Sequence, residues 1–115
     1  MNEISKRIEP VAPAVVVTGA TQGLGKALAE EFARAGHTLL LVARDETALA
    51  TVAKALSREH NVEVKFVAAD LCTVEGCDAV EKALARSGLY ADILVNNAAI
   101  MSAGFFQDQD PATLR

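Results

Sequence analysis

The sequence predicts an α/β fold in which helices cover both faces of a parallel sheet. Short apolar runs alternate along the chain with segments of roughly ten or more residues that have helical apolar spacing. A glycine-rich stretch, TGATQGLG at residues 18–25, separates the first apolar run from the first helical segment. Parallel strands need right-handed crossovers between them, and helical segments of this length supply such crossovers.

The first strand and helix flank the glycine-rich stretch. The β-branched run before it predicts a strand over residues 15–18. A helix is expected over residues 24–35, with an apolar stripe of Leu24, Ala27, Leu28, Phe32 and Ala35. Gly36 then suits the position just after the helix, which favours glycine.

The second strand and helix have the strongest patterns in the chain. Residues 38–43 (TLLLVA) form a continuous apolar run, which is typical of a strand buried on both faces. Asp45 is a suitable N-cap for the following helix. The apolar stripe of that helix consists of Leu49, Val52, Ala53 and Leu56.

The third strand, third helix and fourth strand complete the pattern. Residues 62–68 begin with alternating apolar residues, which favours a strand near a sheet edge. Thr73 suits the N-cap of a helix that ends near Gly88 and has the stripe Cys77, Val80 and Leu84. Residues 93–96 are the expected fourth strand, and Asp110 with Pro111 resembles the start of another helix.

These elements predict a βαβαβαβ half of a Rossmann fold with strand order 3-2-1-4. Residues 1–13 are expected to be an N-terminal extension, and residues 14–115 a partial nucleotide-binding domain. In such a sheet the ligand lies at the carboxyl ends of strands one and four, where the winding direction reverses.

Composition narrows the functional classes. The chain has 115 residues, 51% of them hydrophobic, which indicates one ordered domain. Its net charge of −4 argues against a nucleic-acid partner. No stretch predicts a membrane span or a signal peptide, so we expect a cytoplasmic protein with no membrane partner.

The cysteines and histidines predict no metal site. Cys72 and Cys77 fit neither a CxxC pair nor a disulfide framework, and Cys77 falls on the apolar stripe of the third helix as a core residue. His37 and His60 have no partnering cysteine at metal-ligand spacing.

The glycine-rich stretch predicts a dinucleotide phosphate site. A helix N-terminus has unpaired backbone N–H groups and a partial positive charge, which together favour a pyrophosphate. Gly19, Gly23 and Gly25 provide either positive φ angles or space that no Cβ fills. The alternative interpretation is that these glycines serve tight strand-to-helix packing. A mononucleotide phosphate loop is excluded because Ala20 and Ala27 replace its first glycine and its hydroxyl residue.

Three motifs in order resemble the short-chain dehydrogenase/reductase family. They are TGATQGLG in the first turn, Asp70-Leu71 after the third strand and NNAA at residues 96–99 after the fourth. The resemblance runs from Ala14 to the end of the chain, but it covers only the amino-terminal part of the family's usual length. It implies hydride transfer between a nicotinamide cofactor and a small carbonyl or alcohol substrate.

The resemblance assigns cofactor contacts residue by residue. Gly19, Gly23 and Gly25 form the phosphate turn, which is lined by Thr21, Gln22 and Leu24. By the same resemblance Asp70 contacts the adenine ring with Leu71 beside it, Asn96 and Ala98 lie against the ribose, and Asn97 fixes the central strands. Ala99 replaces the family's glycine. The alternative interpretations are that Asp70 terminates its strand and that the two asparagines are turn residues.

Arg44 favours NADP(H) over NAD(H). An NAD site places a carboxylate about twenty residues after the glycine turn to accept the ribose hydroxyls. Here that position is Ala43, and Arg44 follows with a guanidinium that suits a 2′-phosphate. Asp45 is assigned to the helix cap, and the alternative for Arg44 is a solvated residue at a strand end.

No catalytic residue is assigned within the chain. The family uses a Tyr-x-x-x-Lys pair, in which the tyrosine is the general acid or base. Tyr90 is followed four residues later by Leu94, so we expect it to be a structural residue before the fourth strand. The resemblance places the catalytic residues and the homo-oligomer contacts downstream of Arg115.

Two further expectations concern the end of the chain. Residues 100–109 would border the active site, with Phe105 and Phe106 as a substrate wall or as packing residues. Standing alone, these 115 residues would have an exposed fourth strand, and we expect them to be marginally stable or to self-associate. The alternative function is a non-catalytic nucleotide-binding or interaction module.

Overall fold

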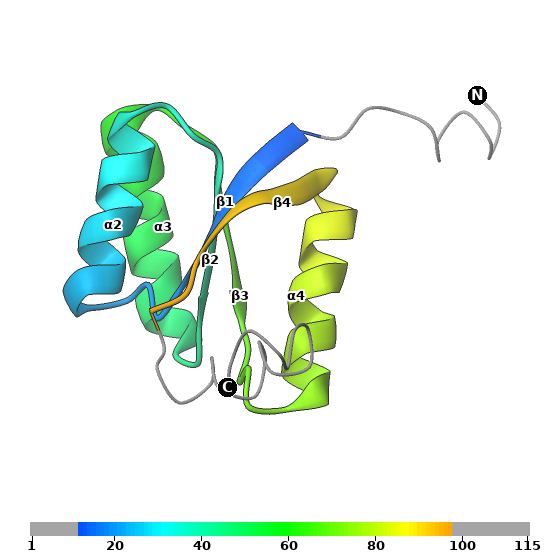
Figure 1. The fold of residues 1–115 in the computed structure, drawn as a ribbon. Coiled ribbons are helices and arrows are strands. Elements are labelled where there is room, and N and C mark those ends of the chain that lie inside the picture. The colour runs from blue at the N-terminus through cyan, green and yellow to red at the C-terminus, as the bar shows by residue number, and fades with distance from the viewer. Residues whose placement is uncertain (1–11, 98–115) are drawn as a thin grey trace, which may run out of the picture.

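The computed structural model describes residues 12–97 (Figure 1). Its elements are β1 (Ala12–Thr18), α2 (Gly23–Arg34), β2 (Leu39–Ala43), α3 (Glu46–His60), β3 (Val64–Ala68), α4 (Val74–Arg86) and β4 (Leu89–Val95). The strands pair in parallel in the order β3-β2-β1-β4. The structure therefore confirms the predicted fold class and strand order.

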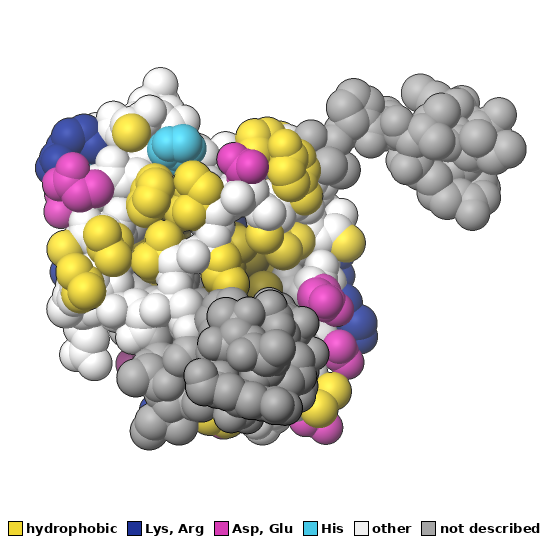
Figure 2. All heavy atoms as spheres, in the orientation of Figure 1, with side chains coloured by type: hydrophobic (Ala, Val, Ile, Leu, Met, Phe, Trp, Pro, Cys, Tyr) yellow, Lys and Arg dark blue, Asp and Glu magenta, His cyan; other side chains and the backbone are white. Residues whose placement is uncertain are grey.

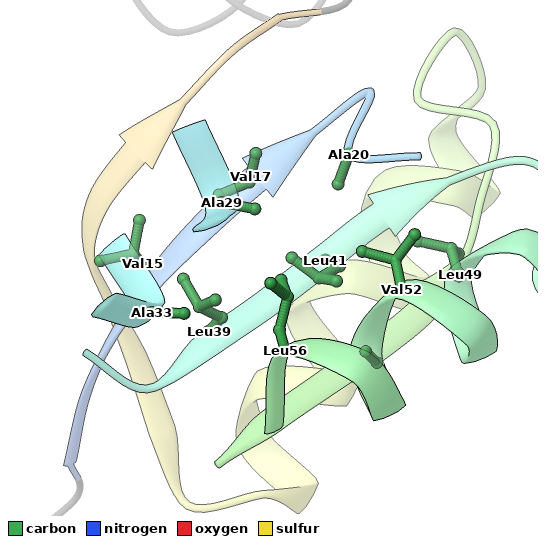
Figure 3. Close-up of a cluster of buried hydrophobic side chains, with 11 residues drawn as sticks. Val15, Val17, Ala20, Ala29, Ala33, Leu39, Leu41, Leu49, Val52 and Leu56 are labelled. Atoms are coloured by element: carbon green, nitrogen blue, oxygen red, sulfur yellow. The ribbon is translucent and has the colours of Figure 1, made fainter. Parts of the chain in front are cut away.

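Helices cover both faces of the sheet. α2 and α3 lie on one face and α4 lies on the other (Figure 1). Successive side chains of a strand point to opposite faces, so Leu39 and Leu41 join the cluster under α2 and α3, whereas Leu40 and Val42 join the cluster under α4. Figure 3 shows the first and larger cluster, in which side chains of β1, β2, α2 and α3 point toward one another.

α3 agrees with its sequence pattern. All four residues of the predicted stripe are buried: Leu49, Val52, Ala53 and Leu56. The Asp45 carboxylate accepts a hydrogen bond from the Ala48 N–H at 3.1 Å, as an N-cap does. α4 likewise has the predicted cap, since the Thr73 hydroxyl accepts from the Gly76 N–H at 2.9 Å. Cys77, Val80 and Leu84 pack against the cluster beneath α4.

The predicted stripe of α2 was partly wrong. Its buried residues are Gly25, Ala29 and Ala33, whereas Leu24 is 64% exposed and Ala27 and Ala35 are exposed as well. Leu28 and Phe32 from the predicted stripe are half-buried. The helix therefore turns its smallest side chains toward the sheet, which lets the two backbones approach closely.

The limits of β4 and β3 also differ from the prediction. β4 begins at Leu89 instead of residue 93, so Tyr90 lies within the strand, opposite Pro13 of β1. The pairing shifts by one residue between Ala14 and Val15, which places an irregularity in this ladder. β3 begins at Val64 instead of residue 62, and its mostly exposed side chains agree with its place at one end of the strand order.

β4 lies at the other end of the strand order, as the sequence predicted. Its Tyr90 and Leu94 side chains are 45% and 39% exposed. Figure 2 shows apolar side chains gathered on the face of the molecule where β4 is in front. Within residues 12–97, no helix is both long and apolar enough to cross a membrane.

Candidate functional site

The carboxyl ends of the four strands bring the predicted site residues to one edge of the sheet. Gly19 follows β1, Arg44 follows β2, Asp70 comes after β3 and Asn96 follows β4. The Ala20 N–H donates to the Val42 carbonyl at 3.4 Å, which joins the glycine turn to the end of β2. This edge is the place where parallel α/β sheets bind ligands.

The glycine turn has a backbone that a residue with a side chain would adopt only under strain. Gly19 and Gly23 have φ angles of 61° and 60°. A Cβ on Gly23 would have no described atom within 4 Å. No atom of the described residues therefore blocks the approach of a ligand to the backbone at Gly23.

Gly25 is required for packing within the chain. A Cβ on Gly25 would overlap the Gly19 carbonyl oxygen and would lie 2.8 Å from Nδ2 of Asn97. A Cβ on Gly19 would lie 3.3 Å from the same Asn97 nitrogen. Gly25 therefore serves tight strand-to-helix packing, as the alternative interpretation expected. This role is compatible with a phosphate site, because the close approach of Gly25 to Gly19 sets the position of the start of α2.

Thr18 connects the glycine turn after β1 to the turn after β4, a role that was not predicted from the sequence. Its hydroxyl accepts a hydrogen bond from the Asn97 N–H at 2.9 Å and faces Oδ1 of Asn96 at 3.0 Å as a donor. The residue is 3% exposed. The sequence signal that could have identified it was a threonine at the carboxyl end of the predicted first strand, directly before the glycine-rich turn.

The N-terminus of α2 differs from those of the other two helices. Asp45 caps α3 and Thr73 caps α4, but the Gln22 side chain makes no capping hydrogen bond to α2. The first turn of α2 contains no acidic residue, whereas α3 has Glu46 and α4 has Glu75 there. Its first backbone N–H groups and the positive end of its dipole therefore suit an anion supplied by a ligand.

The other predicted contacts have different surroundings. Arg44, Gln22 and Leu24 are exposed at the edge, and Thr21 is half-buried. Asp70 is exposed, and its carboxylate accepts from the Cys72 N–H at 2.9 Å, which is the turn role that the alternative interpretation gave it. Leu71 is 9% exposed and packs under α4, so its side chain faces the core.

Several predictions fall outside the described residues. Ala98 and Ala99 of the NNAA motif, the segment of residues 100–109 with Phe105 and Phe106, and the helix start at Asp110 all lie there. Residues 1–11 of the predicted extension, residues 1–13, lie there too, whereas its last two residues, Ala12 and Pro13, belong to β1.

Titratable groups gather at the opposite end of α2 and α3. Ligand atoms of Glu30, Glu59 and His60 lie within 4.8 Å of one another, and Nε2 of His60 is 3.3 Å from the Glu59 carboxylate. This contact is an ion pair when the ring is protonated. Nearby, the exposed Arg34 guanidinium donates a hydrogen bond to the Glu31 carboxylate, and this bond together with the negative charge of the carboxylate raises the pKa of Arg34.

The family is decided by a match over most of the chain. Residues 13–115 match the model of the short chain dehydrogenase family. The chain belongs to this family. The Very-long-chain 3-oxoacyl-CoA reductase-A of Danio rerio is 46% identical over 85 residues, which cover 74% of this chain and 26% of that protein. An 11-beta-hydroxysteroid dehydrogenase-like 4A of Arabidopsis thaliana is 40% identical over 95 residues, covering 82% of this chain and 31% of that protein.

A solved reductase structure has a similar architecture. The L-sorbose reductase of Gluconobacter frateurii, determined with NADPH and L-sorbose, is 42% identical with a TM-score of 0.72. The match covers 77% of this chain and 34% of the reductase. The present chain thus spans about a quarter to a third of the length of these relatives.

Proposed function

We propose that this chain is the dinucleotide-binding part of an NADP(H)-dependent oxidoreductase. The observation that carries the proposal is the uncapped N-terminus of α2, which lies beside a glycine turn with open space at Gly23. A pyrophosphate satisfies both the free N–H groups and the helix dipole. The family membership and the NADPH-bound L-sorbose reductase support the same function.

The residues around the turn suit the remaining parts of the cofactor. Arg44 would hold the 2′-phosphate through its guanidinium, and Ala43 beside it offers no carboxylate to accept ribose hydroxyls. Asp70 would contact the adenine, with Leu71 contributing from its backbone, while Asn96 and Ala98 would lie against the ribose. Thr21, Gln22 and Leu24 would line the phosphate turn.

A bound nicotinamide would supply or accept a hydride, and the substrate would be a small molecule with a carbonyl or alcohol group. The site residues of this chain would bind and orient the cofactor. The family's proton-transferring Tyr-x-x-x-Lys pair does not occur in the 115 residues, so we expect this chain alone to bind cofactor without turnover. We also propose a homo-oligomeric, cytoplasmic enzyme. A non-catalytic module is not favoured, because the relatives are reductases and dehydrogenases.

The cofactor preference is tested by replacing the arginine. In the whole protein, Arg44→Asp should weaken NADPH binding by about ten- to a hundredfold, because a charge-assisted contact to phosphate is lost and a repulsive charge is added. NADH binding should weaken far less. Calorimetric titration of both cofactors measures the two affinities. Arg86→Asp on α4 is the matched control, and an unchanged NADPH affinity in Arg44→Asp would reject the assignment.

A further inference from the structure

A hollow lies between α3 and β3, at the end of the strand order opposite β4. Its volume is about 380 Å³, within the range of about 300–1,000 Å³ that is usual for small-molecule sites. The lining comes from one stripe of α3 and one face of β3: Ala50, Ala53, Lys54, Ser57, Arg58, Val64 and Phe66. The proposed cofactor contacts do not include any of these residues.

The floor of the hollow is apolar and open. Ala50 and Ala53 are small, so α3 leaves space above the strand at this level. Phe66 is 38% exposed on a strand that pairs with β2 alone among the described strands. The Ser57 hydroxyl donates to the Val62 carbonyl at 2.8 Å, which fastens the loop between α3 and β3. The result is a preformed apolar surface with an aromatic ring available for contact.

The cations of the hollow lack carboxylate partners in the described part of the chain. Within residues 12–97, the ion pairs join Arg34 with Glu31 and Lys65 with Glu63, and His60 contacts Glu59. Lys54 and Arg58 belong to none of them, and they are one helical turn apart, where like charges repel each other. An anion placed between the two side chains would relieve this repulsion.

We propose that the hollow binds a small amphiphilic carboxylate. The carboxylate lies between Lys54 and Arg58, and the hydrocarbon body covers Phe66 and Val64 against the two alanines. Apolar surface provides affinity and the paired cations provide orientation, which is the usual division in small-molecule sites. The site is separate from the nucleotide site, so its occupancy requires no cofactor.

The direct test is titration of the full chain with decanoate, monitored by NMR of labelled backbone amides. The changes in amide chemical shift should concentrate in α3 and β3. Decanol, which lacks the charge, should bind at least about tenfold more weakly than decanoate. Shifts confined to the carboxyl edge near Gly19 would overturn the proposal, as would equal affinities for decanoate and decanol. Repeating the decanoate titration with saturating NADPH, which would occupy the carboxyl edge, distinguishes binding in the hollow from binding at the proposed nucleotide site.

Two variants test the two halves of the site. Lys54→Gln with Arg58→Gln should lower decanoate affinity by about tenfold. The matched control is Lys82→Gln with Arg86→Gln, the same pair of residue types at the same spacing at exposed positions of α4, which should leave the affinity unchanged. Ala50→Phe should abolish binding by filling the floor without altering charge. Equal affinity in the charge variant and its control, with both folded by circular dichroism, would overturn the proposal.

Discussion

The starts of α2 and α4 have the same close packing but different capping. Gly25 in α2 contacts the preceding turn so closely that a Cβ would overlap the Gly19 carbonyl oxygen, and Gly76 in α4 stands in the same relation to the Asp70 carbonyl oxygen. At α4 the Thr73 hydroxyl accepts from the Gly76 N–H. At α2 the Gln22 side chain caps nothing. Tight strand-to-helix packing is therefore a structural feature of both turns, and the missing cap is what makes the start of α2 suitable for an anion.

The largest effect is expected at Gly25. Gly25→Ala forces a Cβ into the Gly19 carbonyl and toward Asn97, so unfolding free energy should fall by about 2 kcal/mol or more. NADPH affinity of the whole protein should also be lost, because the start of α2 moves. Chemical denaturation and calorimetric titration measure the two effects. Gly88 has a positive φ, and a Cβ there would have no atom of residues 12–97 within 4 Å, so Gly88→Ala is the control that separates packing from backbone strain.

Thr18→Val should have the next largest effect. The substitution keeps the side-chain shape but leaves the Asn97 N–H without its acceptor, at a cost of about 1–3 kcal/mol in unfolding free energy. Thr18→Ser retains the hydroxyl and should recover most of the stability. If valine and serine gave equal denaturation midpoints, the hydroxyl would not be the link between the turns of β1 and β4.

Thr73→Ala removes the cap of α4 and should lower unfolding free energy by about 1 kcal/mol. The Thr73 hydroxyl also donates to the Asp70 carbonyl at 2.7 Å, but the Thr73 N–H keeps its own hydrogen bond to that carbonyl at 3.0 Å in the variant. NADPH affinity should therefore stay near that of the parent protein. Thermal unfolding with and without NADPH measures both quantities. A loss of affinity of about tenfold would place the start of α4 in the binding site and would remove the contrast with α2.

Gln22→Asp gives α2 the kind of cap that α3 already has. Gln22 has the extended backbone of an N-cap residue, so the variant should gain about 0.5–1 kcal/mol of stability without ligand. It should also bind NADPH more weakly, because the new carboxylate competes with the pyrophosphate. Gln22→Asn caps without charge and separates competition for N–H groups from repulsion. Higher NADPH affinity in the aspartate variant would contradict the anion site.

The parts of the fold that follow from local pattern were predicted well. α3 has large apolar residues at regular spacing, and its buried face matches the prediction at Leu49, Val52, Ala53 and Leu56. The caps Asp45 and Thr73 were predictable because a cap contacts an N–H three residues away. The turn formed by Gly19 and Gly23 was likewise predictable, since a backbone with positive φ favours glycine.

The sequence by itself determined the alternation of strands and helices, the strand order and the edge at which the motif residues meet. The tertiary structure decided the buried face of α2. A sequence pattern favours burial of the large apolar Leu24, whereas the structure buries the small residues Gly25 and Ala29. It also decided the start of β4, where exposed Tyr90 joins the strand through pairing with β1. The contact between Thr18 and Asn97 spans 79 positions, so the hydroxyl acquires its partner when β1 and β4 are brought side by side.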